Sequence, residues 1–378
     1  MAGIYVHIPF CSSRCIYCDF YSTTFGLSMR EDYVHALCEE LISRSDELES
    51  QEICTLYFGG GTPSLLTLDQ LGKIIHTLSN HYHFSVSPEI TLESNPDDVT
   101  EDLARGWRAL GFNRVSLGVQ TFQDDILKIL RRRHTSATAC EAVRLLREAG
   151  FENLTLDLIY GLPGQTFEIW QQDVQRILQQ PIQHLSSYAL SFEPGTAITK
   201  MKDRKEIQEA DEETIRRMYL YLIEATQAAG FEHYEISNFA KPGFASQHNS
   251  SYWHGIPYLG AGPGAHSYDG KNVRRANSPD LKKYIQQIGN PPHTLEKLSP
   301  VQLYEEYLLT GLRTAQGISS EFVKEEFGMK VWHRMQRLAE SHLQKGNLKQ
   351  NGDQISLTLE GILISDYIIS DLMVAGDD

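Results

Sequence analysis

Residues 3–20 read GIYVHIPFCSSRCIYCDF, and this stretch decides both the fold and the chemistry expected of the chain. Its first half is a short apolar run, which predicts a strand over 4–8. Its second half places Cys11, Cys15 and Cys18 on one tight loop directly after that strand. Thiolates suit iron–sulfur clusters and zinc, so the loop predicts a metal centre.

Two kinds of metal centre fit three clustered cysteines. Structural zinc sites normally use four protein ligands, and His7 could supply a fourth, although ordinary packing also explains a histidine in this strand. A [4Fe-4S] cluster on three cysteines would instead keep one iron open. That iron could chelate the amino and carboxylate groups of S-adenosylmethionine (SAM), and reduction would then split off a 5′-deoxyadenosyl radical. We favour the cluster, because no second Cys-x-x-Cys pair occurs in the chain.

Composition narrows the class of protein further. The 378 residues include 34 Lys plus Arg and 49 Asp plus Glu, a net charge of −15, which disfavours a nucleic-acid partner. Neither a signal-peptide pattern nor a run of 18 apolar residues occurs, so we expect a cytoplasmic protein. In a reducing compartment the scattered Cys38, Cys54 and Cys140 are expected to be packing residues rather than disulfide partners.

Short strand patterns alternate with longer helical patterns from residue 3 to about 235. The strand candidates are 4–8, 55–58, 89–93, 114–119, 155–159 and 185–191. Capping patterns predict helix starts at Ser28, Thr67, Ser136 and Thr166, and glycines predict helix ends at Gly150 and Gly230. Full-length crossovers between the strands require them to be parallel.

A doubly wound sheet and a barrel both satisfy this alternation. The positions of the polar residues favour one of these two folds. The cysteine loop and the 59–62 glycine run each follow a strand, and Glu93, Gln120 and Asp157 lie at or near the ends of other strands. In barrels the functional residues gather at the carboxyl ends of several strands. Six units are two short of eight, so we predict an α/β fold with an open, partial (β/α)6 TIM-like barrel over residues 1–235.

The rest of the chain follows a different pattern. Residues 236–290 are irregular and rich in Gly, Pro, His and aromatic residues, which indicates a functional connecting segment. Residues 291–378 are again helical, and Asn351-Gly352 predicts a hairpin turn, so a small winged-helix-like domain is expected. Residues 300–378 hold 7 basic and 12 acidic residues, a net charge of −5, so we expect packing or protein contact rather than DNA binding.

Several motifs together resemble one known family. The loop CSSRCIYCDF, in which Tyr17 precedes the third cysteine, resembles the cluster loop of radical SAM proteins. With it, GGGTPS at 59–64, TLESNP at 91–96, RVSLGVQTF at 114–122 and LDLIYGLPGQT at 156–166 resemble the oxygen-independent coproporphyrinogen III oxidase group. The resemblance covers nearly the whole chain.

Within that group the chain resembles the heme chaperone (HemW) branch. The decarboxylating oxidase has a further cysteine two positions after the third cluster cysteine, and this chain has Phe20 there. The oxidase also has an N-terminal arm that is almost missing here, while HNSSYW at 248–253 is similar to the HNxxYW signature of the chaperone branch. Oxidative decarboxylation of coproporphyrinogen III to protoporphyrinogen IX stays open as the alternative activity.

The resemblance implies a set of site residues. Cys11, Cys15 and Cys18 would hold the [4Fe-4S] cluster. The residues expected to bind SAM or support its site are Tyr5, Tyr17, Gly60, Gly61, Thr62, Glu93, Gln120, Arg132, Asp157 and His266. No catalytic residue is assigned. The family leaves room for a second SAM, whose carboxylate would suit Arg132.

The resemblance also implies heme as cargo. His248 is the candidate iron ligand, and Tyr252 and Trp253 could stack on a porphyrin face. Equally, His248 and Asn249 could simply hydrogen-bond a tight turn, and His254 and His266 are alternatives as ligands. The partners that the resemblance implies are heme-accepting respiratory proteins and a second copy of the chain in a homodimer. Peripheral membrane association through a partner is compatible with this scheme.

Overall fold

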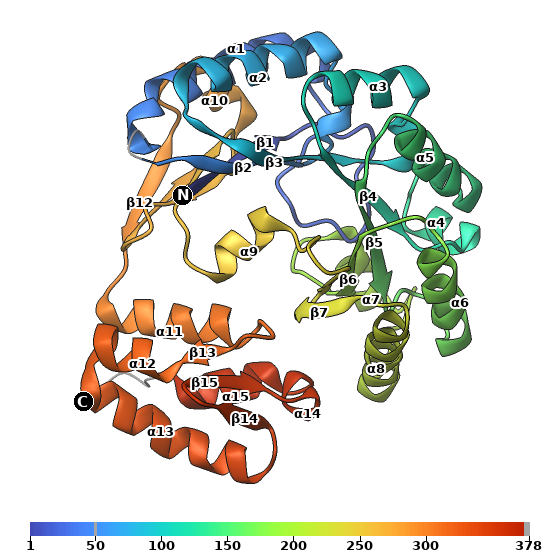
Figure 1. The fold of residues 1–378 in the computed structure, drawn as a ribbon. Helices are drawn as coiled ribbons and strands as arrows, with labels where there is room; N and C mark the ends of the chain where they lie inside the picture. The colour runs from blue at the N-terminus through green and yellow to red at the C-terminus, as the bar shows by residue number, and fades with distance from the viewer. Residues whose placement is uncertain (49–50, 374–378) are drawn as a thin grey trace.

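The computed structural model describes residues 1–48 and 51–373 and is built on one large curved sheet (Figure 1). In the described chain, the twelve strands of this sheet follow the order β12-β11-β10-β9-β1-β2-β3-β4-β5-β6-β8-β7. The six central strands are parallel and adjacent in chain order: β1 (Ala2–Ile8), β2 (Ile53–Gly60), β3 (Phe84–Ser94), β4 (Arg114–Gln120), β5 (Asn153–Tyr160) and β6 (His184–Ala189). A doubly wound sheet would reverse its order at a switch point, so the unbroken order confirms the predicted partial barrel.

Helices between these strands cover the convex outer face of the sheet (Figure 1). They are α1 (Arg30–Ser43), α2 (Leu68–His81), α3 (Glu101–Ala109), α4 (Asp124–Ile129), α5 (Ser136–Glu148), α6 (Phe167–Leu178), α7 (Ala197–Asp203) and α8 (Glu212–Ala228). Trp107 of α3 and Trp170 of α6 are fully buried in the main hydrophobic core. Burying such large side chains under the sheet is a main source of stability for this layer.

Three of the predicted helix starts are confirmed and one is wrong. Thr67 caps α2 through a hydrogen-bonded capping box, Thr166 caps α6, and α5 begins at Ser136. Ser28 caps no helix, because it lies inside a 3-10 turn (Leu27–Met29) that leads into α1. Its hydroxyl is therefore past the position from which it could accept a hydrogen bond from the first helical amides.

Residues 232–297, a stretch that includes the connecting segment expected over 236–290, extend the same sheet at both edges. The added strands are β7 (Glu232–Glu235), β8 (Asn238–Ala240), β9 (Tyr258–Ala261), β10 (His266–Tyr268), β11 (Val273–Asn277) and β12 (His293–Lys297). Strand β9 is parallel to β1, and β8 is antiparallel to β6. Helix α9 (Gln247–Trp253) lies on the concave side and contacts β1 and β2, whereas α10 (Leu281–Gln286) packs on α1 (Figure 1).

The C-terminal part has a hydrophobic core of its own, which includes Tyr304, Leu308 and Met335. Its helices are α11 (Pro300–Gly311), α12 (Ser320–Phe322), α13 (Gly328–Gln344), α14 (Leu359–Ile362) and α15 (Ser365–Leu372), and its strands are β13 (Ile318–Ser319), β14 (Leu348–Asn351) and β15 (Gln354–Leu357). The predicted hairpin joins β14 to β15 through Gly352, whose φ is 63°. Helices with a small three-stranded sheet match the winged-helix-like domain expected here. The exact domain boundaries at residues 235 and 290 stay predictions.

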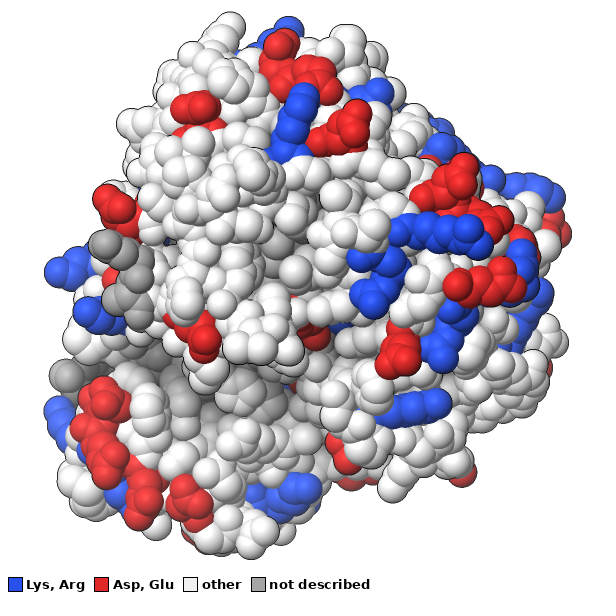
Figure 2. All heavy atoms as spheres, turned by 45° about the horizontal axis from the view of Figure 1, so that its top comes forward, with Lys and Arg blue, Asp and Glu red and all other residues white. Residues whose placement is uncertain are grey.

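Charged residues are mixed on the face that Figure 2 shows. Lys and Arg alternate with Asp and Glu on the barrel, at the right, while acidic side chains gather on the C-terminal part at the lower left. That distribution agrees with the acidic excess of residues 300–378. In the part of the chain that the structure describes, no helix is both long enough and apolar enough to cross a bilayer.

Candidate functional site

The carboxyl ends of the six parallel strands open onto a cavity of about 480 Å³. The cysteine loop forms one wall, and residues from β2 through β6 form the others. Most of the predicted site residues line this cavity: Cys11, Cys15, Tyr17, Cys18, Gly60, Gly61, Thr62, Glu93, Gln120, Arg132 and Asp157. Separate strands thus bring together residues that are far apart in the sequence, as barrel geometry predicts.

The cysteine loop is closed at its base by the backbone. Cys11 N donates to Thr23 O at 2.9 Å, and Thr23 N donates to Pro9 O at 2.7 Å. His7 reinforces this closure from β1, because its Nε2 donates to the carbonyl oxygen of Tyr21 at 2.8 Å. The loop therefore leaves the strand and returns to the same point, which holds all three thiols over the cavity.

Polar groups already point at two of the thiols. Thr62 Oγ1 donates to Cys11 Sγ at 3.5 Å, and Arg132 Nη1 donates to Cys15 Sγ at 3.3 Å. Burial raises the pKa of the Cys11 thiol, and it raises the pKa of Cys18 to about 11. Such thiols stay protonated unless a cation compensates, and a coordinated metal deprotonates a thiol outright. The donor set therefore fits a cationic cluster.

The geometry favours a cluster over a single zinc ion. Among the described residues, no three Cys, His, Asp or Glu side chains come close enough to share one metal ion. A [4Fe-4S] cluster needs no such closeness, since each cysteine binds a different iron. His7, the alternative fourth zinc ligand, does not line the cavity, and its Nδ1 lies 3.1 Å from the Tyr5 hydroxyl. The described lining contains no fourth cysteine, which keeps one iron available to SAM.

The glycine run is required by close packing under the cysteine loop. A Cβ on Gly60 would lie 2.6 Å from the His7 ring, and the φ of Gly60 is 108°, a conformation that side chains disfavour. A Cβ on Gly61 would lie 2.7 Å from the carbonyl oxygen of Phe10. The glycines therefore let β2 approach the base of the cysteine loop, and they leave this wall of the cavity open to a ligand.

Two half-buried carboxyl groups face the cavity. Glu93 accepts from the Tyr57 hydroxyl at 2.8 Å and from Gly60 N at 3.2 Å, and Ser116 Oγ donates to Asp157 at 3.2 Å. Burial raises the pKa of Glu93 to about 7 and that of Asp157 to about 6. Carboxyl groups that titrate near neutral pH can accept hydrogen bonds from hydroxyl or ammonium groups of a ligand. Shifted pKa values of this kind are typical of functional sites.

Strained backbone also lies at the cavity. Gln120 and the neighbour of Arg132, Arg131, have φ values of 70° and 59°, which residues other than glycine rarely adopt. Arg132 donates through Nη2 to Asn95 Oδ1 at 2.7 Å and to Gly118 O at 2.6 Å, and its Nε has no partner in the described protein. Its guanidinium is thus fixed beside Cys15 rather than on the solvated patch that the Arg131–Arg133 run suggests.

Two residues expected near SAM lie elsewhere. Tyr5 sits behind the β2 wall, where its ring stacks on Tyr57 and its hydroxyl contacts His7. His266 is exposed on β10 and does not line the cavity. Neither side chain lines the cavity, so a direct contact of either residue with SAM stays a prediction. The Tyr5 hydroxyl supports the cysteine loop through His7.

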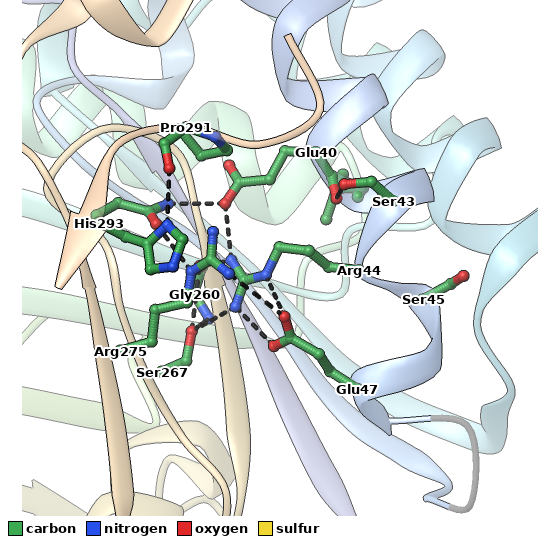
Figure 3. A network of polar contacts seen from close by, with 12 residues as sticks. Glu40, Ser43, Arg44, Ser45, Glu47, Gly260, Ser267, Arg275, Pro291 and His293 are labelled. Atoms are coloured by element: carbon green, nitrogen blue, oxygen red, sulfur yellow. Dashed lines mark hydrogen bonds and ion pairs between the residues drawn. The ribbon is translucent and has the colours of Figure 1, made fainter. Parts of the chain in front are cut away.

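The glycine-rich loop before His266 has a supporting role (Figure 3). Glu40 of α1 is fully buried and accepts from Arg44 Nη1 at 2.7 Å, as Figure 3 shows. It also accepts from Gly262 N at 2.9 Å and from Asn277 Nδ2 at 2.7 Å. A Cβ on Gly262 would lie 2.5 Å from the carbonyl oxygen of His7. The loop is thus held against the end of β1, directly behind the cysteine loop, and this packing explains its small residues.

His248 is fully enclosed on the concave side of the sheet. Its Nδ1 lies 2.8 Å from Thr55 Oγ1 and its Nε2 lies 2.9 Å from the Tyr252 hydroxyl, so both ring nitrogens are engaged. Burial lowers the pKa of His248 to about 3, which keeps the ring neutral. Both nitrogens thus have protein partners in this conformation, and the bond to Thr55 of β2 ties α9 to the sheet rather than closing a local turn. Heme ligation by His248 stays a prediction.

The remaining aromatic residues of HNSSYW do not reach the cavity either. Tyr252 packs edge-on against Tyr258, and Trp253 ends α9. Glu89 of β3 accepts from the backbone amides of Gln247 and His248 at 3.1 and 3.0 Å, which fixes the start of the helix inside the sheet. Asn249, which we expected to serve a turn, instead lines the cavity floor. The motif therefore forms a plug on the concave side of the sheet.

Several cavity residues could not be predicted from the sequence. Tyr57, Ser116, Ser186 and Tyr188 line the cavity although they lie in strands rather than after them. Asn95 could have been found, because it belongs to the TLESNP stretch whose Glu93 was selected. The inward-facing serines carry no such signal, since alternating serines are also common on solvated strands.

Three thiols without a fourth cysteine, at the mouth of a partial parallel barrel, define a radical SAM protein. A sequence model of the radical SAM superfamily matches residues 5–177, and one of the HemN C-terminal domain matches residues 298–364. Coproporphyrinogen III oxidase (HemN) from Escherichia coli has a similar structure, with a TM-score of 0.86 over 99% of this chain and 90% of that chain; at 23% identity this likeness shows the fold.

Curated relatives narrow the class. The chain is 36% identical to heme chaperone HemW of Lactococcus lactis over 85% of this chain and 84% of the relative. It is 32% identical to heme chaperone HemW of Bacillus subtilis over 97% and 98%. The chain therefore belongs to the HemW family, and membership of the radical SAM superfamily implies a [4Fe-4S] cluster and SAM.

Proposed function

We propose that this protein is a radical SAM heme chaperone, which binds heme and delivers it to heme-requiring proteins. The observation that carries the proposal is the identity of 32–36% to heme chaperones over most of the chain. Phe20 supports it, because the resemblance places a further cysteine of the oxidase at that position. Coproporphyrinogen III oxidation is the alternative, and the fold likeness to HemN does not distinguish the two.

The cavity residues have separate tasks in this proposal. Cys11, Cys15 and Cys18 would hold the cluster, while Gly60 to Thr62, Glu93 and Asp157 would hold SAM. When bound, the reduced cluster and SAM supply a 5′-deoxyadenosyl radical. Arg132 would orient the thiolate of Cys15 and the carboxylate of a bound SAM, since its guanidinium already lies beside that thiol.

The partners follow from the same assignment. The heme acceptors would be respiratory proteins, and the chaperone would act in the cytoplasm as a homodimer. Contact with a membrane would come through the acceptor.

Anaerobic reconstitution tests the function in one sample. The cluster is rebuilt in the full chain, hemin binding is followed by its absorption band, and porphyrin products are followed after adding coproporphyrinogen III, SAM and a reductant. Stoichiometric hemin binding without a porphyrin product is the expected result. Repeated turnover to protoporphyrinogen IX without hemin binding would identify an oxidase instead.

A further inference from the structure

Two large aromatic side chains stand exposed at the mouth of the cavity. Phe20 follows the third cluster cysteine and is 65% exposed, and Tyr188 at the end of β6 is 44% exposed. Both line the cavity, and they come from separate elements. Isolated exposed aromatic residues are common, but two on one concave surface are typical of a binding site for a large apolar ligand.

The volume of the cavity limits which ligand can bind inside it and which must bind at its mouth. A volume of about 480 Å³ is that of a site for one drug-sized ligand. The residues proposed for SAM, among them Gly60, Glu93 and Asp157, lie on the strand ends that form its inner walls. A ligand as large as heme therefore has room only across the mouth when SAM is bound.

The mouth also offers positive charge. Arg14 and Arg131 line it, and in the described chain neither takes part in an ion pair; Arg14 Nη2 donates only to the carbonyl oxygen of Cys18, at 3.3 Å. Arg133 is paired with Asp97 and Asp98, and Asp19 is the exposed carboxylate of the same rim. Unpaired arginines on a chain with a net charge of −15 are suited to the carboxylates of a ligand.

We propose that heme binds across this mouth, with its ring face on Phe20 and Tyr188 and its two propionates near Arg14 and Arg131. The proposal rests on the heme chaperone function proposed above and assigns the site within it. Among the described residues that line the cavity there is no histidine. Heme would therefore be held by its face and its propionates, and an axial position of the iron would stay accessible to a ligand from the acceptor.

Hemin titration of the cluster-loaded full chain tests the site. In Phe20→Ala/Tyr188→Ala we expect hemin affinity to fall about tenfold or more, because two aromatic contacts are removed. In Arg14→Gln/Arg131→Gln we expect a fall of about threefold or more for hemin. Hemin dimethyl ester, which lacks the propionate charges, should bind this second variant as it binds the unaltered protein.

Controls separate this site from the general function. Phe322→Ala removes an aromatic residue of similar exposure, 41%, from the C-terminal part and should leave hemin affinity unchanged. Iron and sulfide contents verify that each variant still holds its cluster. If the unaltered protein binds no hemin, the chaperone function itself fails. If it binds hemin and both double variants bind equally well, or if His248→Ala or His266→Ala abolishes binding, the mouth is not the heme site.

Discussion

Cys11, Cys15 and Cys18 lie within eight residues, but they meet different surroundings. Cys11 is buried beside Thr62, whereas Cys15 is partly exposed and lies beside Arg132. A cluster bound through three irons needs all three thiolates, so the loss of one should release it. None of the three loop cysteines can therefore be lost without loss of the cluster, unlike the scattered cysteines elsewhere in the chain.

The first prediction concerns these ligands. Replacing Cys11, Cys15 or Cys18 singly by alanine should reduce iron and acid-labile sulfide after anaerobic reconstitution to near background. Cys54→Ala is the matched control, because Cys54 lies in β2 away from the cavity lining, and it should retain full iron. Full iron content in any of the three loop variants would contradict the assignment.

Glu93 provides a prediction for pH dependence. Its pKa of about 7 in the folded chain exceeds the unfolded value of about 4.3, so folding binds its proton more tightly. The stability from this group is fully present below the unfolded pKa and is lost as the pH rises through 7. In the cluster-free chain, Glu93→Gln should therefore raise the melting temperature at pH 8 relative to the unaltered protein, and the gain should shrink toward pH 5.

The control for this titration is Glu232→Gln on exposed β7, which should shift the melting temperature little at either pH. Asp157 titrates in a similar environment, so Asp157→Asn should reduce the same pH dependence from a slightly lower pH. If the melting temperature of Glu93→Gln changes with pH from 5 to 8 in the same way as that of the unaltered protein, Glu93 does not carry a raised pKa.

At the scale of elements, helix α9 places the HNSSYW motif inside the sheet. His248→Ala would remove hydrogen bonds to Thr55 and Tyr252 and leave a buried space, so we expect it to lower the free energy of unfolding by about 3 kcal/mol. Tyr252→Phe removes one of these bonds and should cost about 1 kcal/mol. Chemical denaturation of both variants measures the difference, and equal stability of His248→Ala and the unaltered protein would refute the packing role.

Glu40 ties α1 to the glycine-rich loop behind the cluster. It is fully buried with four donors around it. Glu40→Gln would leave Arg44 with the half-exposed Glu47 as its remaining charged partner. Breaking a buried ion pair commonly costs about 3 kcal/mol or more. The matched control, Glu31→Gln, breaks an exposed pair with Lys73 and should change the denaturation midpoint little. Similar midpoints for both variants would contradict the anchoring role.

The sequence predicted the long central elements but not the edges of the sheet. The six parallel strands and the cap at Thr67 follow from local patterns that a few residues decide. Strands β7 to β11 are three to five residues long and depend on distant partners, as β9 does on β1. Such short segments show no period, so their pairing could not be read from the chain.

The site residues also divide into those that could be predicted from the sequence and those that could not. Residues that end or follow a strand, such as Gly60 and Thr62, were predicted from motifs and line the cavity, as does Arg132, which follows α4. Tyr5 and His266 do not line the cavity, because a motif does not say to which face a side chain turns. Tyr188 was missed because its exposure at the end of β6 depends on where the chain turns next.

At the scale of the whole molecule, the described residues form three hydrophobic clusters, and the two largest are separate cores that contact each other. The larger core lies under the sheet, and the smaller lies among α11, α13 and α15. Between them, Ile236 N donates to Arg313 O at 3.0 Å, Ala315 N donates to Tyr234 O at 3.0 Å, and Arg274 pairs with Glu306 at 2.8 Å. Besides these polar contacts, Ile362 of α14 packs against both cores. Interfaces within a chain that mix polar and apolar contacts in this way commonly permit separate motion.

The two cores should therefore unfold in two calorimetric transitions. Leu308→Ala removes a fully buried side chain of the smaller core and should lower one transition, whereas Leu117→Ala should lower the other, each by the several degrees that a loss of about 3 kcal/mol produces. SAM added to the cluster-loaded chain should raise the transition of the larger core, since ligand binding stabilises the part that holds the site. A single transition that both variants lower equally would mean that the contact between the cores couples them into one cooperative unit. Ligand binding in the cavity would then stabilise the C-terminal part as well.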